Sequence, residues 1–329
     1  MKILIGLIII AIGAFCQSSS YVPINKIKQW SWESYWLVQG IFAWLLFPLL
    51  GALIAIPSGH SLLELYASDL KATLLTMFFG VLWGIGGLTF GLSMRYLGIA
   101  LGQSIALGTC AALGTILTPL FTGHPENLTS PVLIGVAVTL CGIAIIGFAG
   151  KLKPKGEDTI KEFNFVKGLS GALLAGFMSA CFGIGLGFGE NLCFAESAEI
   201  FKGLPATLLI TIGGFLTNAV YCLYQNSKNR TFSDYRQRSL YVNNLSFCAL
   251  AGLLWYSQFF GLSLGKGFLS EAPALLAFSW CILMALNVTF SNVWGIVLKE
   301  WKGTSQKAII ILVIGLVTLI ISCFLPQLL

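Results

Sequence analysis

The stretch that decides the fold is PVLIGVAVTLCGIAIIGFAG, residues 131–150, which contains no charged side chain. A helix of this length can cross the hydrocarbon core of a bilayer, which takes about 20 mostly apolar residues. Similar stretches occur at approximately 3–19, 34–56, 72–94, 97–121, 166–190, 205–225, 240–264, 274–298 and 306–325. The sequence therefore predicts an all-α, polytopic membrane protein with ten transmembrane helices.

The composition excludes most other classes of protein. Hydrophobic residues make up 57% of the 329 residues and charged residues 10%, whereas a soluble domain carries about 25% charged residues. The net charge of +6 does not indicate nucleic-acid binding, because the basic residues lie in short loops rather than on one face. The sequence shows no cluster of paired Asp or His residues that would suggest the catalytic site of an enzyme. The nine cysteines form no CxxC pair and the two histidines lie in loops, so we expect no metal and no cofactor.

The distribution of basic residues predicts the orientation of the chain. The loops after the first, third, fifth, seventh and ninth helices hold 15 of the 19 Lys and Arg residues. The opposite side holds only Lys2, Lys71, Lys202 and Lys266. Because basic loops stay in the cytoplasm, both termini are expected on the outer, periplasmic side of the inner membrane.

The longest basic loop, residues 151–167, divides the chain into two halves of five helices. Halves with an odd number of spans lie in opposite orientations, as in the inverted repeats of many secondary transporters. The sequence LW followed by FGLS occurs in the third helix of each half, at 82–83 and 90–93 and at 254–255 and 260–263. We therefore expect a first repeat over 1–152, a cytoplasmic linker over 153–165 and a second repeat over 166–329.

Glycines are expected to bring helices into close contact. Gly80, Gly84 and Gly87 recur on one face of the third helix, and Gly183 and Gly187 repeat the spacing in the sixth. Small residues four positions apart allow two helix backbones to touch. Such surfaces would also allow helices to slide between two arrangements.

The polar residues within the spans are amides, hydroxyls and aromatic rings with almost no charge. Amides donate and accept hydrogen bonds, and aromatic faces pack on the C–H faces of sugar rings, so the set suits an uncharged polyhydroxylated ligand. A phosphate would require intramembrane Arg or Lys, and a cationic drug would require a carboxylate. For each single amide, a hydrogen bond between helices is the alternative. The candidate substrate-binding residues are Trp83, Gln103, Asn218, Trp255, Tyr256, Gln258, Trp280 and Asn287.

The carboxylates lie at the periphery of the predicted spans. Glu33 opens the second helix on the cytoplasmic side and Glu190 closes the sixth on the outer side. A proton-coupled carrier needs an ionisable group that changes its exposure, which makes these two the candidates for proton coupling. The alternative role for each is a charge at a helix end.

Several motifs occur in the order found in one transporter family. They are KQWSWE at 28–33, WGIG at 83–86, MRYLG at 94–98, WYSQFF at 255–260 and VLKEW at 297–301. In these motifs the chain resembles the L-rhamnose/proton symporter family of the drug/metabolite transporter superfamily. The resemblance implies a central cavity lined by the first, third and fourth helices of each half. It also implies uptake of a deoxyhexose with a proton.

Together these features predict a secondary active transporter, not an enzyme, that imports L-rhamnose or a related neutral deoxy sugar with protons by alternating access. Its partners would be the sugar, the proton and the lipid bilayer, with no nucleic acid. The alternative is an exporter or exchanger of another neutral metabolite that is not proton-coupled. The absence of a buried carboxylate in the predicted spans favours that alternative.

Overall fold

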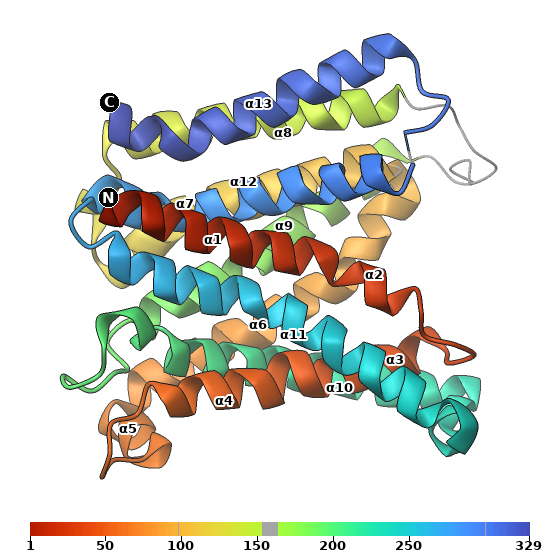
Figure 1. Ribbon diagram of the computed structural model, residues 1–329, viewed down its shortest axis with the longest axis horizontal. Helices are drawn as coiled ribbons and strands as arrows, with labels where there is room; N and C mark the ends of the chain where they lie inside the picture. The colour runs from red at the N-terminus through yellow and green to blue at the C-terminus, as the bar shows by residue number, and fades with distance from the viewer. Residues whose placement is uncertain (98, 153–163, 300) are drawn as a thin grey trace.

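The protein is a bundle of long helices (Figure 1). The computed structural model describes residues 1–97, 99–152, 164–299 and 301–329. Ten helices are long and apolar enough to cross a membrane, and no strand occurs in these ranges. The predicted all-α architecture with ten spans is confirmed. The linker predicted over 153–165 lies outside the described residues except for 164 and 165.

The spans follow one another along the chain, some of them interrupted by short helices. They are α1 (Lys2–Ser19), a second span made of α3 (Trp32–Gly40), the π-helix η1 (Ile41–Leu46) and α4 (Phe47–Ile54), then α6 (Leu70–Leu97), α7 (Ile99–Thr122), α8 (Ser130–Lys151), α9 (Phe165–Phe188), α10 (Leu204–Asn229), α11 (Arg238–Phe268), α12 (Pro273–Val297) and α13 (Gln306–Leu328). The connections contain α2 (Tyr21–Ile24), α5 (Leu62–Ser68) and the 3₁₀ turns η2 (Pro125–Asn127), η3 (Glu199–Phe201) and η4 (Thr231–Arg236).

Local sequence signals explain where several helices begin. Pro131, Pro205 and Pro273 lie in the first turns of α8, α10 and α12, where a missing N–H leaves no helical bond unmade. Asn164 caps α9 by accepting a hydrogen bond from Lys167 N at 3.0 Å. Ser305 caps α13 by accepting from Ala308 N at 3.3 Å. These helix starts follow from single residues that the sequence displays.

The second span departs from α geometry just before Pro48. Proline has no N–H to donate, and in an α-helix its ring clashes with the carbonyl four residues earlier, here that of Trp44. The six residues Ile41–Leu46 instead form a π-helix, in which Phe47 N bonds to Phe42 O. In this wider turn each N–H bonds to the carbonyl five residues earlier rather than four. Such segments frequently occur at functional sites.

Glycines hold several helix pairs in backbone contact, as predicted. A Cβ atom on Gly13 of α1 would lie 2.8 Å from Ser257 O of α11, and one on Gly84 of α6 would lie 2.9 Å from Gly214 Cα of α10. Among the described residues, no atom lies within 4 Å of the corresponding position at Gly87, which was expected to share this contact face. Gly87 is thus too far around α6 to reach a neighbouring helix.

Helices α8 and α13 pack together at one edge of the bundle (Figure 1). A Cβ on Gly142 would lie 3.3 Å from Gly315 O, so their backbones nearly touch. Thr139 Oγ1 donates to Ser322 Oγ at 2.9 Å across this contact. The same hydroxyl also lies 3.0 Å from Gly135 O of its own helix.

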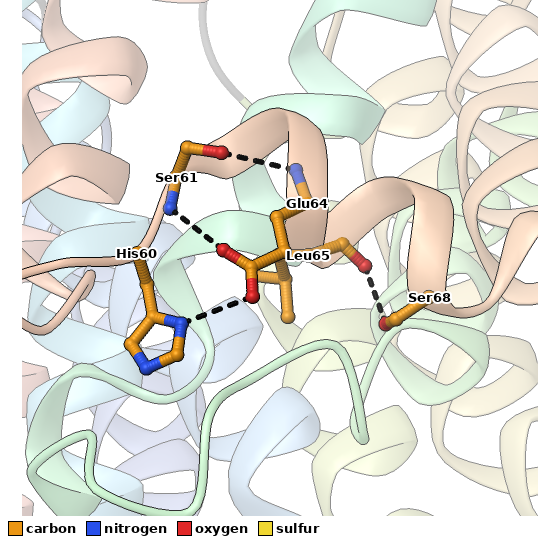
Figure 2. Close-up of polar contacts among 5 residues, drawn as sticks. All are labelled: His60, Ser61, Glu64, Leu65 and Ser68. Atoms are coloured by element: carbon orange, nitrogen blue, oxygen red, sulfur yellow. Dashed lines mark hydrogen bonds and ion pairs between the residues drawn. The ribbon is translucent and has the colours of Figure 1, made fainter.

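Helix α5 lies at the end of the bundle that carries both chain termini, at the opposite corner from them (Figure 1). Figure 2 shows the capping box that starts this helix: Ser61 Oγ accepts from Glu64 N at 3.2 Å, and Ser61 N donates to Glu64 Oε2 at 3.4 Å. His60 Nδ1 lies 3.1 Å from Glu64 Oε1 in the same view. The His60 ring also packs on Phe194, with centroids 4.3 Å apart. The capped helix is thereby joined to the loop between α9 and α10.

Candidate functional site

Three tryptophans from different spans meet inside the bundle. The ring centroids of Trp44, Trp83 and Trp255 lie 5.7–5.9 Å from one another. Trp44 stands nearly perpendicular to the other two, with interplanar angles of 90° and 81°. We call these residues the tryptophan cluster. The prediction included Trp83 and Trp255, whereas Trp44 was counted only as an apolar residue of its span.

A second group of rings continues from this cluster. Phe182 stacks on Phe259 with centroids 3.9 Å apart and on Trp280 with centroids 5.9 Å apart. Phe182 also meets Trp83 edge-on at 5.0 Å, and Phe259 meets Trp255 at 5.2 Å. The three predicted stacking residues, Trp83, Trp255 and Trp280, therefore belong to one continuous aromatic layer. Rings of this kind prefer such offset and edge-to-face arrangements.

Two of the predicted amides bind each other beside this layer. Asn287 Nδ2 donates to Gln258 Oε1 at 2.9 Å, and Gln258 Nε2 donates to Trp255 O at 3.1 Å. Both side chains are buried, and Asn287 Oδ1 has no hydrogen-bond partner among the described residues. Ser18 Oγ of α1 donates to Asn287 O at 3.1 Å. The pair therefore presents one free acceptor at the junction of α1, α11 and α12.

The other predicted polar residues are placed differently. Asn218 accepts from Trp36 Nε1 at 3.1 Å and donates to Gly214 O at 2.9 Å, so its amide is used in helix packing. Tyr256 is directed at Gly51 of α4 rather than at the tryptophan cluster, and its hydroxyl has no partner in the described part of the chain. Gln103 is half-buried on α7, and no described contact joins it to the aromatic layer.

Two adjoining cavities open near the end of the bundle where α9 finishes and α12 begins. Their volumes are about 150 and 310 Å³, and the larger is near the lower limit of ligand sites, about 300–1,000 Å³. Both are lined by Glu190 and Lys266. Trp280 lines the smaller cavity and Phe259 the larger one. The cavities thus lead from charged residues to the aromatic layer.

The two candidate carboxylates lie at opposite ends of the bundle. Glu190 is exposed and lines the cavities, whereas Glu33 lies at the start of α3 with only 6% of its surface exposed. The Glu33 carboxylate accepts hydrogen bonds from Asn229 Nδ2 and Thr231 Oγ1, both at 2.9 Å. The expectation that no carboxylate is buried was therefore wrong.

A second buried carboxylate, which sequence reasoning missed, lies near Glu33. Asp234 is 8% exposed, and its Oδ2 accepts from Ser31 N at 2.8 Å and from Ser31 Oγ at 2.7 Å. Ser31 Oγ lies 2.8 Å from Ser34 Oγ, which in turn donates to Asn226 Oδ1 at 2.9 Å. This polar network joins the second span to the segment after α10. No periodic pattern marks it in the sequence, because η4 is a short 3₁₀ turn between two spans.

The fold and its interior define a multi-pass membrane carrier, with charged cavities at one end, an aromatic layer within and a sealed polar network at the other end. A model of the L-rhamnose-proton symport protein family matches residues 1–328, and the chain belongs to that family. Among its relatives are the L-rhamnose-proton symporters of Yersinia pestis (strain Pestoides F) and Yersinia pseudotuberculosis serotype O:1b (strain IP 31758). Each is 33% identical over 97% of this chain and 96% of its own length.

Proposed function

We propose that this protein imports L-rhamnose, or a closely related neutral deoxy sugar, with protons by alternating access. The observation that carries the proposal is the match to the family along essentially the whole chain. The interior supports it chemically, because the aromatic layer and the Gln258–Asn287 pair offer stacking surfaces and neutral hydrogen-bonding groups without a charge. A sugar ring needs those two kinds of contact.

Sugar binding is tested by thermal unfolding of the purified protein in detergent. A ligand that binds only the folded state raises the melting temperature by mass action. We expect L-rhamnose to raise it and D-glucose to leave it unchanged. Gln258→Ala removes the partner of Asn287 and should abolish the L-rhamnose shift while the protein still unfolds cooperatively. An unchanged shift in that variant would refute the assignment of the amide pair to the site.

The conformation fits a carrier that is open toward the outside. The excess of basic residues in the odd-numbered loops supports placing the cavities and both termini on the periplasmic side of the inner membrane. Sugar would then enter past Glu190 and Lys266 and reach Phe259 and Trp280. The polar network around Glu33 and Asp234 would close the cytoplasmic end. Cysteine labelling of each terminus from the outside tests this orientation.

The helix contacts support two inverted repeats, 1–152 and 166–329. Exchanging the first five spans with the last five maps the main contacts onto one another. Helix α6 packs on α9 as α11 packs on α1, α7 packs on α9 as α12 packs on α1, and α6 packs on α10 as α11 packs on the second span. Such symmetry supplies two related conformations, one open to each side.

Proton coupling is assigned to Glu190, Glu33 or both. Moving one charge through roughly 150 mV yields about 3.5 kcal/mol, or a few hundredfold accumulation of sugar. A Gln variant of the coupling residue should lose proton-driven accumulation but keep exchange of labelled for unlabelled sugar. Glu271→Gln serves as the control, because Glu271 is an exposed residue paired with Lys2. If neither Glu33→Gln nor Glu190→Gln alters accumulation, the assignment is refuted.

Uptake that persists in the presence of a protonophore would overturn the coupling itself. That result would favour an exchanger of neutral metabolites on the same fold. The buried Glu33 removes the sequence-based argument for such an exchanger, since the chain does enclose a carboxylate.

A further inference from the structure

We propose that Trp44 binds the transported sugar directly and that its indole N–H donates a hydrogen bond to a sugar hydroxyl. The inference rests on the proposed function, since it assumes a sugar as the ligand. It adds a residue that lies within an otherwise apolar stretch of the second span. Three separate observations carry it: the unpaired N–H, the position against two other indoles, and the π-helix.

The indole N–H of Trp44 is buried without a partner. The side chain is 5% exposed, and Nε1 has no acceptor among the described residues. Two other indoles in the interior have partners: Trp36 Nε1 donates to Asn218 Oδ1 at 3.1 Å and Trp280 Nε1 donates to Cys110 O at 3.2 Å. Trp30 Nε1 is also unpaired, but Trp30 lies before α3 at the end of the bundle, against Tyr235. A buried donor left unpaired is costly, which indicates a function for the one in the interior.

The position of Trp44 is that of a stacking ligand. Its ring packs edge-on against both Trp83 and Trp255, with centroids 5.9 Å from each, while those two rings lie 5.7 Å from one another. A pyranose ring that packed against this cluster would come close to the unpaired Trp44 N–H. The unpaired Asn287 Oδ1 lies on the next helix from Trp255 and provides an acceptor. Since sugar hydroxyls both accept and donate hydrogen bonds, they can pair with the unused Trp44 N–H donor and with the unused Asn287 Oδ1 acceptor.

The backbone gives Trp44 a way to move. Trp44 belongs to the π-helical residues Ile41–Leu46, and a change from π to α geometry shifts the register of the segment by one residue. One residue corresponds to a rotation of about 100° around an α-helix. The indole could therefore turn away from Trp83 and Trp255. This movement would break its hydrogen bond to the sugar and favour release.

The test compares binding of L-rhamnose and its monodeoxy analogues to the wild type and to Trp44→Phe. The variant keeps an aromatic ring and lacks the N–H. We expect it to bind L-rhamnose about three- to tenfold more weakly, the effect of one net hydrogen bond. We also expect it to lose discrimination against one analogue, the one without the hydroxyl that accepts from Trp44. The matched control is Trp36→Phe, because Trp36 lies on the same span but already donates to Asn218. It should affect all analogues equally.

A second readout uses the wild-type fold. The ¹⁵N-indole resonance of Trp44, assigned by its loss in Trp44→Phe or Trp44→Tyr, should move on addition of L-rhamnose and not of D-glucose. Equal weakening of every analogue, or a resonance that does not respond to L-rhamnose, would overturn the inference while leaving the transport function intact. A wild type that fails to bind L-rhamnose at all would overturn the proposed function and this inference together.

Discussion

The close contact between α6 and α10 predicts different effects for two identical substitutions on one helix. In Gly84→Ala, the new methyl group would lie 2.9 Å from Gly214 Cα, Gly214 O and Thr217 Cβ. Ordinary contact begins at 3.4 Å, so the helices must separate by about 0.5 Å. In Gly87→Ala, the methyl group meets no atom of the described part of the chain within 4 Å.

The difference between the two variants isolates the steric cost. Both gain the same helix propensity, about 1 kcal/mol, when glycine becomes alanine. Crowding of a packed site costs about 1–3 kcal/mol, so Gly84→Ala should be less stable than Gly87→Ala by about that amount. The separation would also loosen the 3.4 Å bond from Asn218 Nδ2 to Gly84 O and shift Trp83. L-rhamnose binding should therefore weaken in Gly84→Ala alone.

The assay is unfolding of both purified variants in the same detergent, followed by titration with L-rhamnose. We expect Gly87→Ala to match or exceed the wild type in stability. Equal stability of the two variants would refute the idea that α6 and α10 pack through Gly84. If the two variants are equally stable but Gly84→Ala still loses L-rhamnose binding, binding at the tryptophan cluster does not depend on how firmly α6 and α10 pack together.

The cavities, the surface and the second span each provide a further test. Burial raises the pKa of the Cys193 thiol, which lines the larger cavity, so maleimide labelling there should be slow at neutral pH, accelerate as the pH rises and slow again with L-rhamnose. A hydrogen bond from Lys2 lowers the pKa of the Glu271 carboxyl. The stabilisation from this pair is present above the unfolded pKa of Glu271, about 4.3, and is lost as the pH falls through the lower folded pKa. An NMR titration of Lys2→Ala should show the Glu271 pKa returning upward. Pro48→Ala should restore an α-helical second span, rotate Trp44 away from the cluster and weaken L-rhamnose binding more than it lowers stability; full affinity in that variant would contradict the role given to the π-helix.

The spans could be predicted because burial in lipid leaves a strong signal in a single sequence. Uncharged runs of about 20 residues are typical of membrane-spanning helices, and prolines such as Pro131 and Pro205 mark their starts. The boundary predicted between the spans 72–94 and 97–121 was also placed within a few residues, since α6 ends at Leu97 and α7 begins at Ile99. Helix contacts such as those of Gly84 were predictable from spacing, although the spacing did not exclude Gly87.

The site was harder to predict because it depends on three-dimensional neighbours. Trp83, Trp255 and Trp280 stand out as polar-edged rings in apolar spans, and the structure brings them into one layer. Trp44 lies in IFAWLLFPLL, residues 41–50, where nothing but Pro48 indicates an altered helix. The burial of Glu33 could not be read from the chain, because its partners Asn229 and Thr231 are separated from it by 196 and 198 positions.

The pairing of α8 with α13 bears on how the protein is assembled during synthesis. Helix α8 enters the membrane long before α13 is made, and until then Thr139 faces lipid without Ser322. Its hydroxyl nevertheless has an acceptor at once, because Gly135 O lies 3.0 Å away in the same helix. Ser322 is likewise provided for by Leu319 O at 2.7 Å. Each helix can therefore be inserted alone without an unsatisfied hydroxyl in hydrocarbon, and on docking the single Thr139 proton is shared between Gly135 O and Ser322 Oγ.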